Sequence, residues 1–344
     1  MSNAHIEPAG ARSGRARAGL LAVALAGLCA ALAIASLGVG ARPLDPATVI
    51  AALLAPDEGR AAIVVWQLRL PRTLLAVLAG AAMAVSGGLM QALTRNPLAD
   101  PGLVGINAGA AFSVVTAIAL FGITRFSSFV WFALGGAALA AGGVYLLSLR
   151  AREADRQVRL VLAGIAVSAS LGAMTGIVTM LDATTFDSFR FWVVGAVGGR
   201  DAGIVLQLLP FVLAGGGLAM ALAAPLNALA MGDELGRALG LPLRAIVGGS
   251  FLAIALLAGG ATAAVGPIAF IGLIVPHLLR PVVGPDWRRI VPLSLLAGPA
   301  LLLASDIAGR VLAPPGEIEA GIITAFIGAP ILLWLVQRQR SGRR

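Results

Sequence analysis

Two arginines form the clearest recognition motif in the sequence. Arg69 and Arg72 enclose a leucine and a proline at the start of a long apolar segment. Proline is favoured in the first turn of a helix, and residues three apart lie on one helix face. We therefore expect both guanidinium groups to face the same side. This pattern favours docking of an acidic partner outside the cell. The alternative interpretation is that both side chains extend to the membrane interface, as arginine does near helix ends.

A second stretch, residues 225–244, mixes charge with leucine between two apolar segments. Acidic residues are suited to begin a short helix, and glycine followed by proline is suited to end one. Such a helix outside the membrane has little reason to bury leucines unless a partner receives them. The alternative is a surface helix lying on lipid. The residues of this loop that we assign to the contact with a partner protein are Asp233, Glu234, Gly236, Arg237, Leu239, Gly240, Leu241 and Pro242.

Two further segments interrupt the apolar sequence with proline and glycine. Residues 96–102 read Asn-Pro-Leu-Ala-Asp-Pro-Gly, and residues 266–272 read Gly-Pro-Ile-Ala-Phe-Ile-Gly. Irregular backbone at membrane depth must be buried in protein or line a cavity. We therefore predict that these segments line or gate a translocation path. The residues assigned to this path are Asn96, Pro97, Gly102, Gly266, Pro267 and Gly272.

Motifs of catalysis and cofactor binding are missing from the sequence. All 25 basic residues are arginine, so the lysine that a phosphate-binding loop requires is absent. The sequence contains no GxSxG, HExxH or CxxC motif, and Cys29 is its one cysteine. We therefore expect no cofactor, no metal site and no enzymatic activity of the chain itself. If ATP drives this protein, another chain hydrolyses it.

The composition identifies an integral membrane protein. Of the 344 residues, 59% are hydrophobic and only 12% are charged. A chain this apolar cannot cover itself with polar surface in water. The net charge of +9 does not indicate nucleic-acid binding, because the arginines lie in short loops between apolar segments.

An all-α fold with about ten transmembrane helices follows from the length of the apolar segments, since a crossing helix needs about 20 residues. Spans two to five and seven to ten would form two inverted four-helix groups, each broken after its first member. Gly80, Ala84 and Gly88 form a small-residue stripe that we assign to packing within one bundle. The segments are 19–40, 69–93, 102–121, 128–149, 159–181, 204–224, 244–264, 267–280, 290–311 and 319–337.

The distribution of arginine predicts the orientation in the bacterial cytoplasmic membrane. Most arginines fall in loops on the side of the N-terminus, which favours two cytoplasmic termini and an even number of spans. We expect a cytoplasmic tail over residues 1–18, one transmembrane domain over 19–337 with a cytoplasmic loop at 225–244, and a second tail over 338–344.

An ordered set of motifs between residues 43 and 337 resembles the FecCD family of ABC importer permeases, which serve iron-siderophores, haem and cobalamin. The set includes the Arg69 motif, both proline-glycine segments and the 234–242 loop. It also includes Gly87-Gly88-Leu89-Met90-Gln91 and the stretch from Thr324 to Pro330. The resemblance implies a dimer of two such permease subunits, of the same or a homologous chain, with a translocation path between them. We expect alternating access, in which ATP-driven closure of separate ATPase subunits moves the 234–242 loop and switches the bundle between outward and inward openings.

The same resemblance assigns partners to the motifs. Two cytoplasmic ATPase subunits would bind the 234–242 loop, and an extracytoplasmic binding protein would deliver the substrate. In the family, outward arginines pair with glutamates of that binding protein, and Arg69, Arg72 and Arg310 match their positions. One departure is the outer turn before the last span, where Glu319 replaces the second proline of the family's Pro-x-Glu-Leu-Pro pattern.

An iron(III)-siderophore is the predicted cargo, because residues 186–195 are more similar to siderophore permeases than to cobalamin permeases. Haem or cobalamin import is the first alternative. An ion-coupled secondary transporter is the second, but it would place ionisable residues near the bilayer centre. Here Asp306 and Arg310 lie near the end of one apolar segment and His277 near the end of another.

Overall fold

The computed structural model describes residues 9–40, 42–54, 59–123, 126–149, 156–238 and 240–341, which form helices and no strand. In chain order the elements are α1 (Ala9–Gly38), α2 (Pro46–Leu54), α3 (Arg60–Ile63), η1 (Val64–Arg69), α4 (Leu70–Thr94), η2 (Pro101–Val104), α5 (Ile106–Phe121), α6 (Phe126–Leu149), α7 (Arg156–Leu181), α8 (Ala183–Val193), α9 (Ala202–Ala230), α10 (Asp233–Ala238), α11 (Leu243–Ile254), η4 (Ala255–Gly259), α12 (Gly260–Val265), α13 (Ile271–Val283), α14 (Trp287–Leu312) and α15 (Ala320–Ser341).

Each of the ten apolar segments predicted from the sequence contains a helix. Seven helices in the described part of the chain are long and apolar enough to cross a membrane. Three apolar helices are shorter, namely Ile106–Phe121, Ile271–Val283 and Ala320–Trp334. The all-α class is therefore confirmed, whereas the number of ten crossings stays a prediction. The short helices α2 and α8 were not predicted, because a search for long apolar segments passes over them.

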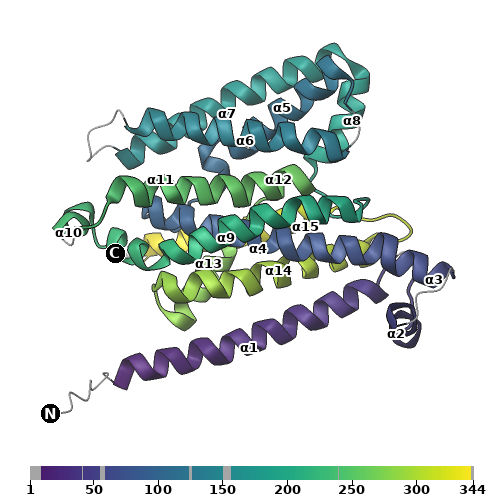
Figure 1. Cartoon of the computed structure of the whole chain (residues 1–344), viewed down its shortest axis with the longest axis horizontal. Helices are drawn as coiled ribbons and strands as arrows, with labels where there is room; N and C mark the ends of the chain where they lie inside the picture. The colour runs from purple at the N-terminus through teal and green to yellow at the C-terminus, as the bar shows by residue number, and fades with distance from the viewer. Residues whose placement is uncertain are drawn as a thin grey trace.

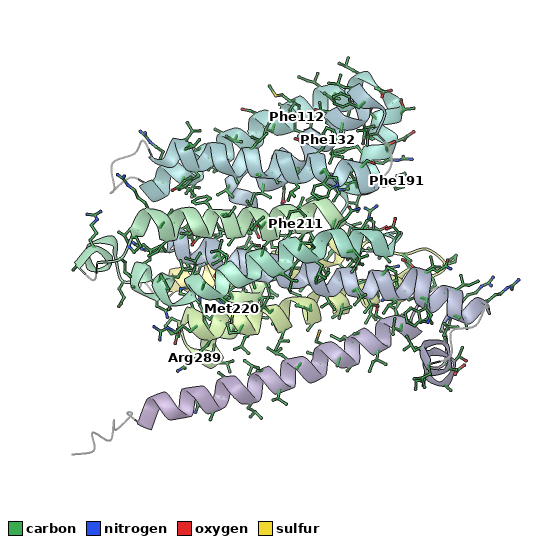
Figure 2. The ribbon with its side chains drawn as sticks, viewed as in Figure 1. Phe112, Phe132, Phe191, Phe211, Met220 and Arg289 are labelled. Atoms are coloured by element: carbon green, nitrogen blue, oxygen red, sulfur yellow. The ribbon has the colours of Figure 1, made fainter. Side chains whose placement is uncertain are left out.

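The helices run roughly side by side, so that the bundle has two ends (Figure 1). The helix α10 lies at one end, together with the start of α1, whereas α2 and α3 lie at the other end. We call these the α10 end and the α2 end. Large apolar side chains project from the outer faces, and Phe191 (68% exposed) and Met220 (46% exposed) are two of those in Figure 2. A bilayer is the solvent that such faces require.

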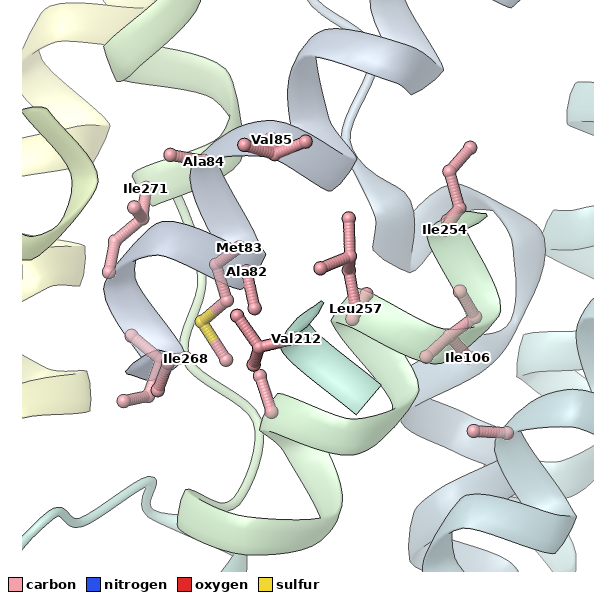
Figure 3. Close-up of a cluster of buried hydrophobic side chains, with 14 of the residues drawn as sticks. Ala82, Met83, Ala84, Val85, Ile106, Val212, Ile254, Leu257, Ile268 and Ile271 are labelled. Carbon is pink, nitrogen blue, oxygen red and sulfur yellow. The ribbon is translucent and has the colours of Figure 1, made fainter. Parts of the chain in front are cut away.

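The helix α4 lies at the centre of the bundle, packed against α14, α9 and α13. Its small residues permit this packing, since a Cβ added at Gly80 would collide with the Gly298 carbonyl of α14 and one at Gly87 with the Gly272 carbonyl of α13. Close backbone approach through small residues is the usual way in which membrane helices associate. The prediction that the glycine stripe packs within one bundle is confirmed. Figure 3 shows α4 residues, including Met83, among apolar side chains of neighbouring elements.

The two predicted four-helix groups exchange their first members. Helices α5, α6 and α7 pack on one another, as α14 does on α13 and α15. The helix α4, however, packs mainly on α14, α9 and α13, whereas η4 and α12 pack on α6. The broken segments 96–102 and 266–272, which follow α4 and α12, allow each first helix to leave its group. The inverted relation of the two groups stays a prediction.

Candidate functional site

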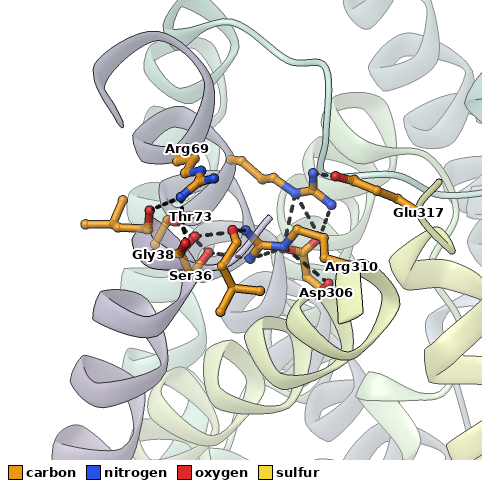
Figure 4. A network of polar contacts seen from close by, with 10 residues as sticks. Ser36, Gly38, Arg69, Thr73, Asp306, Arg310 and Glu317 are labelled. Carbon is orange, nitrogen blue, oxygen red and sulfur yellow. Dashed lines mark hydrogen bonds and ion pairs between the residues drawn. The ribbon is translucent and has the colours of Figure 1, made fainter. Parts of the chain in front are cut away.

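Three arginines and two carboxylates meet at the α2 end (Figure 4). We call Arg69, Arg72, Asp306, Arg310 and Glu317 the arginine cluster. The Asp306 carboxylate is 2% exposed and forms ion pairs with Arg72 and Arg310, each at 2.8 Å. A second oxygen partner for Arg72 is Glu317, whose Oε2 accepts from Nη1 at 2.6 Å. One buried carboxylate therefore bridges two guanidinium groups from different helices.

The C-terminal carbonyl groups of α1 accept hydrogen bonds from two of these arginines. Arg69 donates from Nη1 to the carbonyls of Leu37 and Gly38, at 2.6 and 2.8 Å. Arg310 donates from Nη1 to the carbonyl of Ser36 at 2.8 Å. The last four carbonyls of a helix have no partner inside the helix, and they form the negative end of its dipole. The two arginines therefore fix the end of α1 against α4 and α14.

The three predicted docking arginines differ in their exposure and in their partners. Arg69 is 7% exposed and Arg310 is 4% exposed, and both have internal partners. The side chain of Arg72 is 11% exposed and pairs with Glu317, whose side chain is 32% exposed. An acidic group that approaches from outside therefore reaches the Arg72 and Glu317 pair most directly. The docking role of the three arginines stays a prediction.

A cavity of about 780 Å³ opens beside the arginine cluster, and its lining includes all three predicted arginines. Arg200 and Glu319 also line it, from the loops before α9 and α15. Burial lowers the pKa of Arg200 to about 10, against the opposing effect of the Glu319 carboxylate. Burial likewise raises the pKa of Glu319 above its ordinary value. The glutamate that departs from the family pattern thus places its charge in this cavity.

At the α10 end, residues 233–238 form the short helix that the sequence predicts. Gly240 ends it with a φ of +71°, in the left-handed region that glycine adopts without steric cost. The N–H of Leu241 then bonds the carbonyl of Gly236 at 3.0 Å, which closes the last turn. Pro242 precedes the first residue of α11. This part of the loop prediction is confirmed.

The residues of this loop differ in their exposure to solvent. Gly236 is buried against Leu243, and Leu241 is half-buried, whereas Arg237 and Gly240 are exposed. Leu239 lies outside the described residues, as do the side chains of Asp233 and Glu234. The assignment of this loop to an ATPase contact stays a prediction.

The two broken segments meet beside α4. Leu98 packs against Leu273 and Ile274, and a Cβ added at Gly272 would lie 3.3 Å from Pro101. The structure therefore brings together two segments that the sequence marks separately.

The assigned path residues within these segments have local structural partners. Asn96 accepts the N–H of Leu98 at 3.0 Å, and the Gly102 N–H bonds Asp100 at 2.8 Å. A Cβ at Gly266 would overlap the Trp192 carbonyl. Pro267 lies away from the meeting point, beside Gly195. Their role in a path stays a prediction.

Sequence reasoning missed a set of hydrogen bonds at the α10 end. Asn227 in α9 donates from Nδ2 to Asp286 Oδ1 at 2.5 Å and accepts the Trp287 N–H at 2.9 Å. Gln91 in α4 accepts from Arg280 at 2.8 Å. The signal for these pairs is weak, because the partners lie far apart in the sequence. Among the described residues, no group of three or more His, Cys, Asp or Glu side chains is placed to hold a metal ion.

Comparison with known proteins gives one consistent result. The model of the FecCD transport family matches residues 28–338. The ferric enterobactin transport system permease protein FepD of Escherichia coli (strain K12) is 43% identical over 324 residues, which cover 93% of this chain and 97% of that protein. The hemin transport system permease protein HmuU of Yersinia pestis is 38% identical, over 81% of this chain and 85% of its own length.

A solved structure agrees with the sequence matches. It is described as an inward-facing conformation of a metal-chelate type ABC transporter, and it superposes with a TM-score of 0.82. The superposition covers 93% of this chain and 99% of that chain, with 28% sequence identity. The fold of the described residues is therefore that of an ABC transporter permease.

Proposed function

The chain belongs to the FecCD transport family, and from this premise we propose that it is the permease subunit of a binding-protein-dependent ABC importer for an iron(III)-siderophore. The observation that carries the proposal is the 43% identity to a ferric enterobactin permease over 93% of this chain. The chain itself performs no chemistry on ATP, which separate ATPase subunits hydrolyse. Its own task is to open a path to one side of the membrane at a time.

In the proposed topology, ten helices cross the cytoplasmic membrane and both termini are cytoplasmic. The α2 end, with its cavity, then faces outward, and α10 faces the cytoplasm. Two observations support this topology: α1 begins at the α10 end (Figure 1), and arginine is concentrated in the loops of that side. Residues 19–337 form the permease domain between two short tails.

We assign one partner to each end and a third to the side. A binding protein docks at the outward cavity, where Arg72 is the most accessible of the three predicted arginines. Exposed charge pairs of this kind set orientation and association rate more than affinity. The ATPase subunits bind α10 and its flanking residues. A second permease subunit, of the same or a homologous chain, packs in the bilayer beside this one.

Alternating access follows from these assignments. Closure of the ATPase pair on ATP displaces α10, and the bundle switches between outward and inward openings. The two broken segments are the proposed gate, because they meet beside α4 and consist of irregular backbone. Few charges lie along the helices, which suits a bulky chelate that is moved rather than gripped.

Haem is the second candidate cargo, favoured by the 38% identity to a hemin permease. Uptake in a deletion strain and its complemented twin distinguishes the two cargoes, with labelled ferric siderophores, haem and cobalamin as the panel. We expect loss of one ferric chelate, restored by the gene and abolished by ATP depletion but not by an uncoupler. Loss of haem uptake alone would identify haem, and not a ferric siderophore, as the cargo. Sensitivity to the uncoupler with ATP present would indicate an ion-coupled transporter instead.

A further inference from the structure

The helix α10 follows the end of α9, and three hydrogen bonds hold that end in place. Asn227 lies in the last turn of α9, where its amide donates to Asp286 and accepts the Trp287 N–H at the start of α14. Arg95, the residue after α4, donates from Nε to the carbonyl of Leu229 at 3.1 Å. The end of α9 that carries α10 is therefore joined to the start of α14 and to the end of α4.

The Asn227 link is continuous with a second link deeper in the bundle. The Arg280 guanidinium of α13 lies over the indole ring of Trp287, with its Cζ atom 5.1 Å from the ring centroid. Arg280 in turn donates to the Oε1 atom of Gln91 in α4. Nε2 of Gln91 donates to the Gly272 carbonyl at 3.1 Å. The connection thus runs from α9 through α14, α13 and Gln91 of α4 to the broken segment at Gly272.

Proline explains why an amide is needed at the far end. In a helix the Gly272 carbonyl would accept the N–H of residue 276, but Pro276 has no N–H. Gln91 is 1% exposed and supplies the missing donor. The chain of contacts therefore ends on a backbone group that has lost its helical partner, beside the close crossing of Gly87 and Gly272.

We propose that the contact between Asn227 and Asp286 is the link through which a displacement of α10 reaches α13 and the broken segment at Gly272. This inference rests on the proposed function, in which α10 contacts the ATPase. Asn227 acts here as a positioning residue, since it touches neither ATP nor substrate. A hydrogen bond with an uncharged amide as one partner suits this task, because it contributes modestly to stability and can be exchanged during a movement.

The test exchanges the two polar groups. Asn227→Asp places two carboxylates opposite each other and removes the donor. Asp286→Asn alone retains both the bond and the cap on the Arg288 N–H, because asparagine also caps helices. The double variant Asn227→Asp/Asp286→Asn restores a donor and acceptor pair with the groups exchanged. Asp286→Asn is therefore the matched control, and the double variant is the rescue.

The measurement uses the full complex with its ATPase subunits and binding protein in proteoliposomes, with a labelled ferric chelate as substrate. We expect Asn227→Asp to transport about tenfold less chelate per ATP hydrolysed, a typical size for coupling between sites. The amount of co-purified ATPase and its basal rate should stay unchanged. The control should remain close to the original ratio, and the double variant should return to it.

Four outcomes would overturn the inference. An unchanged ratio in Asn227→Asp overturns the inference, as does an assembled double variant that stays uncoupled. If Asn227→Asp does not assemble, Asn227→Ala removes the link without adding charge, and the same uncoupling is expected. An unchanged ratio in Asn227→Ala again overturns the inference. If the unaltered complex shows no ATP-dependent uptake, the proposed function fails first and the inference falls with it.

Discussion

At the α2 end one buried carboxylate holds two arginines, whereas at the α10 end amide groups connect the helices. Asp306 is 2% exposed and pairs its charge with two charged guanidinium groups. Asn227 donates to the Asp286 carboxylate, and Gln91 donates to two backbone carbonyls. Removing one partner from a buried ion pair leaves a buried charge without a counterion. Removing an uncharged amide takes hydrogen bonds from its partners, which costs less.

The difference indicates which end is built to stay fixed. Charged contacts at the α2 end tie α1, α4 and α14 together along the wall of the cavity. At the α10 end the contacts between the helices are hydrogen bonds in which one partner is an uncharged amide. Substitutions at the two ends should therefore differ in size as well as in kind.

The largest effect is expected for Asp306→Asn. Arg72 and Arg310 would then share the exposed Glu317 as their counterion, and the free energy of unfolding should fall by about 3–5 kcal/mol. Thermal denaturation of the purified permease in detergent measures the loss. The matched control is Asp187→Asn, because Asp187 pairs with Arg190 at 3.3 Å and both side chains are more than half exposed.

The control should leave the melting temperature unchanged, since exposed pairs contribute little. Equal melting temperatures for Asp306→Asn and the unaltered protein would show that burial does not make the arginine cluster rigid. The comparison between the two ends would then lose its physical basis.

A smaller loss is expected for Arg69→Met, which keeps an apolar stem but removes the guanidinium. The carbonyls of Leu37 and Gly38 would lose a charged donor, with about 2–3 kcal/mol of stability. Hydrogen exchange should rise at the end of α1 more than elsewhere. Arg60→Met is the control, because Arg60 is exposed at the same end. A general rise in exchange, without a local maximum, would speak against the clamp on α1.

The sequence predicts the α2 end in part. Arg69 and Arg72 were found from their spacing and from the resemblance, and Arg310 from the resemblance alone; all three line one cavity. The partners of Arg69 and Arg72 were not predicted, because the carbonyls of α1 and Asp306 lie far from them in the sequence. A motif specifies which side chain is present, whereas the fold decides whether its charge is paired within the protein or is accessible to a partner at the surface.

At the α10 end, too, the local structure could be predicted from the sequence but the long-range polar contacts could not. The short helix was predicted from residues close in sequence, namely acidic residues in its first turn and Gly240 after it. Asn227 and Gln91 were missed, since an amide at a helix position carries no signal until its distant partner is known. Local turns follow from the sequence, but long-range polar pairs require the packed structure.

At the α10 end, Gln91→Met should cost about 1–2 kcal/mol, less than either change at the α2 end. The Gly272 and Leu273 carbonyls would lose the Nε2 donor, which lies at 3.1 and 3.3 Å, and the Arg280 guanidinium would lose the Oε1 acceptor at 2.8 Å. Gln207→Met is the matched control, because Gln207 Oε1 is buried without a hydrogen-bond partner in the described part of the chain. Chemical denaturation in detergent compares the two. A larger loss for the control would contradict the role of the Gln91 amide.

The smallest effect is expected for Asp182, which carries the same charge as Asp306 without the burial. Asp182 caps α8 by accepting from the N–H groups of Thr184 and Thr185, at 3.2 and 3.1 Å. Hydrogen bonds from the two threonine side chains, Thr184 first, lower its pKa from 3.8 to about 2. A lowered pKa in the folded state means that the stabilisation is complete above pH 3.8 and is lost as the pH falls through about 2.

Hydrogen exchange at the first amides of α8, corrected for the intrinsic rate, follows this loss. The unaltered protein should lose protection over that interval, whereas Asp182→Asn, which caps without titrating, should not. Asp182→Ala should be unprotected throughout, while its melting temperature stays close to that of the unaltered protein. If Asp182→Ala instead lowered the melting temperature as far as Asp306→Asn does, charge alone would hold the α2 end. Because Asp182 is exposed to water, we expect the two variants to separate widely, with burial as the cause.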